Sequence, residues 1–202
     1  MRSIRAVAEA AILALGALAT GIGAALATGD GEQSGRRATA VLHDANGQRV
    51  GVAVFKERRG KVSVSAEVWR LAPEFHGFHV HAVGVCVPPF TSAGGHFNPA
   101  GVPHGDHAGD LPSLLVNEDG TGQLQFATDR FSVSDLFDAD GSALMVHAGR
   151  DNYANIPSRY RSDATGMPGP DADTLATGDA GARAACGVVE RDRRDDDDRD
   201  DD

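Results

Sequence analysis

Residues 61–70 read KVSVSAEVWR, and along this stretch apolar side chains alternate with polar ones almost without error. Alternation with a period of two places every apolar side chain on the same face of an extended strand. Residues 38–44 and 50–58 alternate in a similar way, and turn sequences at Asn46-Gly47 and Arg59-Gly60 separate the three stretches. The three stretches therefore predict consecutive antiparallel strands joined by tight turns.

The remainder of the chain continues this pattern of short strands. Five further strand-like segments lie at residues 75–83, 114–117, 123–128, 143–147 and 185–190. No long segment after Ala27 has the period of a helix. About eight short strands with two long loops, at 84–111 and 148–182, predict an all-β, eight-stranded antiparallel Greek-key barrel or sandwich. Loops of that length are usually functional or disordered, and the first loop holds three of the eight histidines, which favours function.

The first 27 residues have the features of a targeting sequence. Arg2 and Arg5 precede an apolar run, and Ala25-Leu26-Ala27 fits the pattern of a signal-peptidase site. The apolar run also approaches the roughly 18–20 residues that span a bilayer, so an uncleaved membrane anchor through residues 10–27 is the alternative. Both interpretations predict export, to the periplasm or cell envelope or to the medium.

Composition divides the chain into four parts: a signal peptide or anchor at 1–27, a linker at 28–37, one domain at 38–190 and an acidic tail at 191–202. The tail holds four Arg and eight Asp, a composition that predicts a solvated, disordered segment. The formal net charge of -10 argues against nucleic acid as a partner.

Cys86 and Cys186 are the only two cysteines. In an exported protein they fit a disulfide, which would close a loop of 100 residues. The chain-entropy model gives such a bridge up to about 4–5 kcal/mol of stabilisation. The alternative is two free thiols that act as soft metal ligands.

Six of the eight histidines lie between residues 76 and 107, and a seventh, His147, stands in a strand-like run. His79 and His81 are two residues apart on a predicted strand, so both side chains project from the same face. With His147 from another strand they form the basis of a four-imidazole site, which suits Cu(II). We expect His76 to bond to the backbone and His43 to be a surface residue.

A second group contains His104, His107 and Asp110, which together with His96 offer three nitrogens and one oxygen. A closed set of this kind suits a structural Zn(II). A histidine shared between the two ions would use both of its ring nitrogens. The sequence therefore predicts two metals held close together.

Four runs, in this order along the chain, resemble the copper/zinc superoxide dismutase family: HGFHVH at 76–81, GHFNP at 95–99, HAGDL at 107–111 and GARAACGV at 181–188. The similarity extends over roughly residues 38–189. It implies that a redox-cycling copper and an adjacent structural zinc convert superoxide to dioxygen and hydrogen peroxide. The implied copper ligands are His79, His81, His96 and His147, and the implied zinc ligands are His96, which bridges the two metals, His104, His107 and Asp110.

The resemblance assigns roles to four more positions. Asp151 matches a carboxylate that links a ligand of each metal through hydrogen bonds, and Cys86 and Cys186 match the family disulfide. Arg183 matches the arginine that draws the anionic substrate to copper. Arg183 and His96, which would hold a proton and return it to the nascent peroxide, are the predicted catalytic residues.

Three features depart from the family pattern. Only two residues separate His104 from His107, the loop after Asp151 has no lysine and offers Arg159 and Arg161 instead, and Cys86 lies ten residues before His96.

Two other hypotheses remain. The first is a non-catalytic copper or zinc carrier on the same fold. The second is an adhesion-like envelope sandwich with incidental histidines. The complete ligand set and Arg183 favour the enzyme. The sequence leaves both a homodimer and a monomer open.

Overall fold

The alternating stretches form strands in the structure, a computed structural model that describes residues 36–192. Within that range there are nine strands, one α-helix and two short 3-10 helices. The strands are β1 (Arg37–Asp44), β2 (Arg49–Arg58), β3 (Lys61–Val68), β4 (Glu74–His76), β5 (Phe78–His81), β6 (Leu114–Val116), β7 (Gly122–Thr128), β8 (Ala143–His147) and β9 (Arg183–Arg191). The helices are η1 (Thr91–Ala93), η2 (Val133–Phe137) and α1 (Ala172–Thr177).

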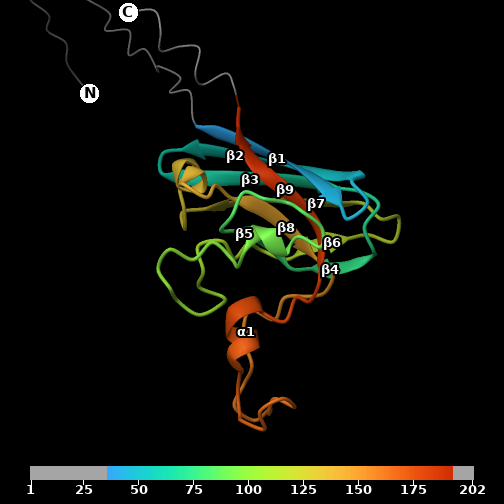
Figure 1. Cartoon of the computed structure of the whole chain (residues 1–202), viewed down its shortest axis with the longest axis vertical. Coiled ribbons are helices and arrows are strands. Elements are labelled where there is room, and N and C mark those ends of the chain that lie inside the picture. The colour runs from blue at the N-terminus through green and yellow to red at the C-terminus, as the bar shows by residue number, and fades with distance from the viewer. Residues whose placement is uncertain (1–35, 193–202) are drawn as a thin grey trace, which may run out of the picture. The chain divides into compact units, whose positions relative to one another are not determined.

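Seven of these strands form one antiparallel sheet in the order β5-β8-β9-β1-β2-β3-β7, and β4 pairs with β6 in a second, two-stranded sheet (Figure 1). Strands β1, β2 and β3 form the expected meander. The last strand, β9, returns to pair with β1, and β7 pairs with β3. Such non-consecutive antiparallel neighbours are typical of Greek-key connections, and the predicted all-β antiparallel fold is confirmed.

The main core is a large cluster of buried apolar side chains inside a curled sheet, and a second, smaller cluster contains Cys186. Along β3 every second residue is buried, from Val62 to Val68, which confirms the period of two. Phe78 of β5 belongs to the same cluster as Phe55 of β2 and Val64 of β3. Because β5 lies at one end of the sheet order and β3 near the other, the sheet must curl so that both face the same core.

The single strand predicted at residues 75–83 is wrong, because the strand is interrupted at Gly77. Strand β4 before it pairs with β6, whereas β5 after it pairs with β8. A Cβ on Gly77 would lie 2.6 Å from the Cβ of Ala180, and the Gly77 carbonyl accepts a hydrogen bond from the backbone of His147. Only glycine allows this close approach. After the interruption β5 pairs with β8, which positions the histidines of both strands.

The long second loop contains the one α-helix of the described residues, which the sequence did not indicate. Asp171 caps the N-terminus of helix α1, where its carboxylate accepts a hydrogen bond from Thr174 N, and Gly178, with φ 61°, caps its C-terminus. Its six residues are too few to reveal a helical period. No helix within residues 36–192 is long and apolar enough to cross a membrane.

Three of the four parts into which the sequence divides the chain lie wholly or largely outside the described range. The signal peptide or anchor at 1–27, most of the linker and residues 193–202 of the tail fall there. Strand β9 ends at Arg191, and the next residue, Asp192, pairs with Arg37 at 2.5 Å. The division into targeting segment, linker, domain and tail stays a prediction.

Candidate metal centre

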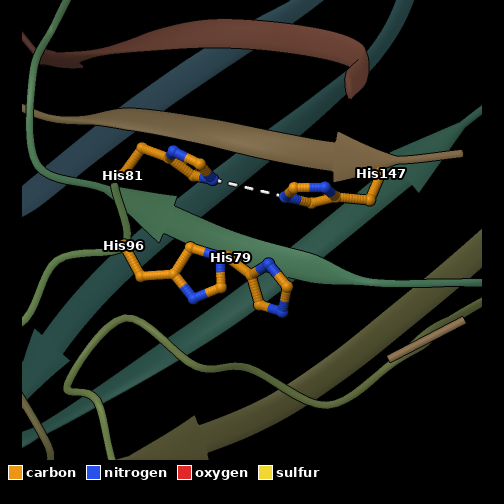
Figure 2. A group of neighbouring side chains, drawn as sticks. All are labelled: His79, His81, His96 and His147. Atoms are coloured by element: carbon orange, nitrogen blue, oxygen red, sulfur yellow. Dashed lines mark hydrogen bonds between the residues drawn. The ribbon is translucent and has the colours of Figure 1, made fainter. Parts of the chain in front are cut away.

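The first cluster of histidines lies where β5 and β8 run side by side. All four residues of β5 are buried: Phe78 and Val80 belong to the core, and the alternate positions are His79 and His81. His147 ends β8 beside them, and His96 reaches the cluster from the loop after η1, bridged to His81. Figure 2 shows the four rings gathered around one point, as the sequence predicted.

One ring nitrogen from each of these four histidines lies within 4.8 Å of the others. The Nε2 atoms of His81 and His147 are 3.3 Å apart. Their Nδ1 atoms donate to backbone carbonyls, that of His81 to Gly94 at 3.0 Å and that of His147 to Gly181 at 3.1 Å. These bonds orient the rings and leave each Nε2 as a lone pair that faces the cluster.

The ring of His79 has the opposite orientation, with Nε2 rather than Nδ1 bonded away from the cluster. Its Nε2 donates to Asp151 Oδ2 at 2.7 Å, and its Nδ1 is buried without a hydrogen-bond partner among residues 36–192. A buried ring nitrogen without a partner is costly unless a ligand satisfies it. Burial lowers the pKa of His79 to about 4, that of His147 to about 3 and that of His81 to about 2. Neutral imidazoles at pH 7 fit a Cu(II) ion bound by four nitrogens.

The second cluster is a tetrahedron of four ligand atoms: the Nδ1 atoms of His96, His104 and His107, and Oδ1 of Asp110. The three nitrogens lie 3.0, 3.1 and 3.2 Å from Asp110 Oδ1. His96 Nδ1 is 3.2 Å from that of His104 and 3.3 Å from that of His107. Zinc bonds of about 2.0–2.1 Å give a regular tetrahedron with edges of about 3.3–3.4 Å. The donor set and its spacing therefore fit zinc, and the short segment from His104 to His107 closes around the site.

Asp110 and Gly105 explain how that segment closes. Asp110 Oδ2 accepts hydrogen bonds from Gly105 N at 2.7 Å and from His107 N at 3.1 Å, so Oδ1 is left to face the histidines. Gly105 has φ 94°, and a Cβ there would lie 2.7 Å from the carbonyl oxygen of Tyr153. A glycine is thus required at position 105 for only two residues to connect the ligands His104 and His107.

Asp151 joins the two clusters. Its Oδ2 accepts from His79 Nε2, and its Oδ1 accepts from His104 Nε2 at 2.8 Å and from Tyr153 N at 2.7 Å. Burial would raise its pKa, but hydrogen bonds from His104 and His79 hold the pKa of Asp151 below its usual range. Burial would also lower the pKa of His104, but Asp110 and Asp151 raise it to about 9. In the metal-free protein His104 is therefore protonated at pH 7, and metal binding releases that proton.

Arg183 lies beside the first cluster. It is paired with His147 across β8 and β9, and its guanidinium donates to the carbonyl oxygens of Phe90 and Gly94. The Gly94 carbonyl is the same one that orients His81. The position predicted for Arg183 thus lies next to the predicted copper ligands.

The cysteines form the disulfide Cys86–Cys186, with the two Cα atoms 5.7 Å apart. The alternative of free thiols as metal ligands is therefore wrong. The bond ties the loop that carries Phe90 to β9, three residues after Arg183.

Two of the remaining histidines have the structural roles expected of them. The ring nitrogens of His76 lie 2.6 Å from the carbonyl oxygen of His147 and 2.8 Å from that of Ala72, and His43 is exposed. Arg159 stacks on Tyr160 and Arg161 donates to Gly166, contacts that lie within their own loop.

The sequence reasoning missed Tyr153 and Gly178. The Tyr153 ring stacks over His104, with centroids 6.5 Å apart, and a Cβ on Gly178 would lie 2.0 Å from Asp151 Oδ1. Nothing in their own sequence surroundings indicates these contacts, because each joins segments far apart in the chain.

Two ligand sets that share one imidazole, built on a curled antiparallel sheet, define a binuclear metalloprotein. Residues 49–189 match the family model described as copper/zinc superoxide dismutase. The chain belongs to that family.

Curated relatives and solved structures agree. The chain is 42% identical over 165 residues to a Cu-Zn superoxide dismutase of Mycolicibacterium paratuberculosis, with 75% of this chain and 73% of the relative covered. It is 34% identical over 158 residues to an extracellular Cu-Zn superoxide dismutase of Brugia pahangi, covering 75% and 74%. Among solved structures, the clock protein EA4 superposes with a TM-score of 0.61 at 31% identity, covering 79% of this chain and 97% of that one. A mutant of a SOD-like protein from Bacillus subtilis gives 0.60 at 30% identity, covering 74% and 95%.

Proposed function

We propose that this protein is a copper/zinc superoxide dismutase, which converts two superoxide ions and two protons into dioxygen and hydrogen peroxide. The observation that carries the proposal is that two complete ligand sets share His96. Copper supplies the one-electron redox couple for both halves of this reaction, and zinc supplies a fixed positive charge that holds the ligand loop.

The protein's first contribution is to hold copper in a rigid frame. His79, His81 and His147 each offer one neutral ring nitrogen, and the other nitrogen of each ring is fixed by a carboxylate or a carbonyl. Because all three rings are buried and bonded on their far side, they resist rearrangement when the charge at the centre changes.

His96 has the role of proton carrier in this proposal. Its Nδ1 belongs to the zinc set, which leaves Nε2 for the copper side. After the first superoxide has left as dioxygen, His96 Nε2 holds a proton. It gives that proton to the second superoxide, which also takes up one electron from the redox couple and a second proton from solvent and leaves as hydrogen peroxide.

Arg183 draws the anionic substrate to the centre. Two carbonyl oxygens hold its guanidinium beside the copper ligands. The formal net charge of the chain is -10, so attraction of superoxide has to come from a local positive potential rather than from the overall charge.

We further propose that the protein acts outside the cytoplasm, in the periplasm or cell envelope or in the medium. The disulfide supports this, because such bonds persist in oxidising compartments. A relative named as extracellular supports it too. Cleavage of the N-terminal segment, anchoring through residues 10–27, and the choice between monomer and homodimer stay predictions.

The test combines metal analysis with a superoxide-decay assay on the same reconstituted protein. About one copper and one zinc per chain with rapid decay is the expected result. Stoichiometric metal without faster decay would contradict the enzyme and indicate a metal carrier. Absence of bound metal would contradict both and leave only the structural sandwich.

A further inference from the structure

The segment between two of the zinc ligands is unusually short, and its peptide groups are held from both sides. Only Gly105 and Asp106 separate His104 from His107. On the inner side, the amides of Gly105 and His107 donate to Asp110 Oδ2. The carbonyl oxygens of the same two residues accept hydrogen bonds from a side chain that follows β7.

Arg130 binds both of these carbonyls. Its Nη1 donates to the carbonyl oxygen of Gly105 at 3.0 Å and to that of His107 at 3.0 Å. The His107 carbonyl also accepts from Asp110 N, whereas the Gly105 carbonyl has no other hydrogen-bond donor among residues 36–192. The amide of the same peptide group, Asp106 N, donates to the carbonyl oxygen of Pro103 at 3.2 Å, so Arg130 and Pro103 together fix the peptide group between Gly105 and Asp106.

The backbone at Arg130 is itself anchored. Its amide donates to Thr128 Oγ1 at 3.2 Å, and the next residue, Phe131, is buried in the core with its ring 6.4 Å from that of Phe55. A side chain that extends from an anchored position loses less freedom when it binds, so its hydrogen bonds hold their targets more firmly. The guanidinium is thus a fixed support although the side chain is exposed.

These contacts follow one another from Arg130 to a metal-ligand atom, Oδ1 of Asp110. Arg130 fixes the carbonyls of the segment, the amides of the segment fix Asp110 Oδ2, and Asp110 Oδ1 lies 3.0–3.2 Å from the three histidine nitrogens. The peptide group that Arg130 holds, between Gly105 and Asp106, lies between the two peptide groups whose amides bind Oδ2. If it rotated, the backbone angles on either side of it would change, the amides of Gly105 and His107 would move away from Oδ2, and the carboxylate would be free to turn.

We propose that Arg130 is a positioning residue for the zinc ligands, which clamps the two-residue segment against Asp110 and thereby slows the release of zinc. The inference rests on the proposed function only in taking the second cluster to be a zinc site. The effect is one of geometry, because a positive charge near a bound cation is repulsive by itself. One nitrogen that carries two hydrogens serves two carbonyls at once, which the guanidinium geometry favours over a lysine ammonium.

The experiment measures zinc release from the full-length, copper- and zinc-loaded protein into an excess of a chromogenic chelator. The variants are Arg130→Ala and Arg130→Lys. The matched control is Arg49→Ala, which removes another arginine, one that stacks on Trp69 away from both metal sets. Removing partners that support metal ligands typically costs 10–100-fold in affinity, and an exposed donor belongs at the lower end. We expect zinc release to be about tenfold faster in Arg130→Ala, with a smaller increase in Arg130→Lys and none in Arg49→Ala.

Three further readouts separate positioning from general destabilisation. Cobalt(II) loaded into the zinc site reports ligand geometry through its visible absorption, which we expect to change in Arg130→Ala and not in Arg49→Ala. The copper spectrum and the thermal midpoint of the metal-free protein should stay at their wild-type values. If Arg130→Ala does not fold, Arg130→Lys carries the test through its release rate.

Each outcome decides the inference. Zinc release at the wild-type rate in both Arg130 variants would overturn it and leave the proposed function untouched. A wild-type protein that binds copper but neither zinc nor cobalt would overturn both this inference and the zinc part of the proposed function. Faster release together with an equal loss of copper would show a structural rather than a positioning role, and would overturn it as well.

Discussion

Breaking the disulfide should cost this fold much of its stability. The perturbation is the double variant Cys86→Ser, Cys186→Ala, in which alanine stands at the buried position, since Cys186 is 1% exposed and packs with Phe90 and Met145. The bond joins residues 100 apart in the sequence. For a loop of that length the chain-entropy model gives about 4.7 kcal/mol, because the unfolded chain gains the freedom that the bond removed.

The free energy of unfolding is measured by urea titration of the metal-free protein, so that metal binding does not contribute. We expect it to fall by about 4–5 kcal/mol, and the thermal midpoint to fall by about 10–20 °C for a domain of this size. Wild-type protein with the bond reduced is the control, because its sequence is unchanged. The slope of the urea titration should rise, since the unfolded chain without the bond exposes more surface.

The same variant tests the link between the disulfide and Arg183. The bond ties β9 to the loop whose Phe90 and Gly94 carbonyls hold the Arg183 guanidinium. We therefore expect kcat/KM for superoxide to fall even at temperatures where the variant is folded. The result that would refute the chain-entropy reasoning concerns stability. It is a decrease in the free energy of unfolding of less than about 1 kcal/mol in both the variant and the reduced wild type.

Three further predictions concern the metal centre. His81→Ala should lose copper and all dismutation while the sheet and the disulfide persist, as measured by elemental analysis, superoxide decay and circular dichroism; an unchanged decay rate would contradict the copper assignment. In the metal-free protein, burial lowers the pKa of His79 from 6.5 to about 4 and that of His147 from 6.5 to about 3. Between about pH 6.5 and pH 4, these two side chains therefore take up protons mainly in the unfolded chain. The free energy of unfolding should therefore fall as the pH falls from about 6.5 to about 4, by about 3 kcal/mol from His79 alone, and urea titrations that give a flat profile would count against it. Gly178→Ala should lower the thermal midpoint and the metal content, because the added Cβ would lie 2.0 Å from a carboxylate oxygen of the aspartate that joins the two clusters. Gly166→Ala, at a similar φ of 66° but with nothing within 4 Å, isolates the backbone strain, and equal effects of the two variants would rule out the clash.

Local patterns in the sequence determined the fold class and the ligands. A period of two along residues 61–70 predicts a strand whatever surrounds it, because the side chains of any extended chain point to alternate faces. His79 and His81 share a face for the same reason. The grouping of His104, His107 and Asp110 is local too, since they lie within seven consecutive residues.

Contacts between distant segments were decided only by the tertiary structure. The break between β4 and β5 lies where Ala180 approaches Gly77. The sequence of residues 75–83 does not indicate this approach, because Ala180 is distant in the chain. The resemblance to known dismutases pointed to Asp151, but the structure shows which of its oxygens binds His79 and which binds His104.

Arg130, Tyr153 and Gly178 had no signal at all in the sequence. Each contacts the metal centre or the segment beside it from a position 23 or more residues away in the chain, as Arg130 does at His107. A short motif records the residues that must be neighbours along the chain, whereas hydrogen bonds and close packing depend on which segments the curled sheet brings together. The ligands could thus be found from the sequence, and the side chains that hold them in place required the fold.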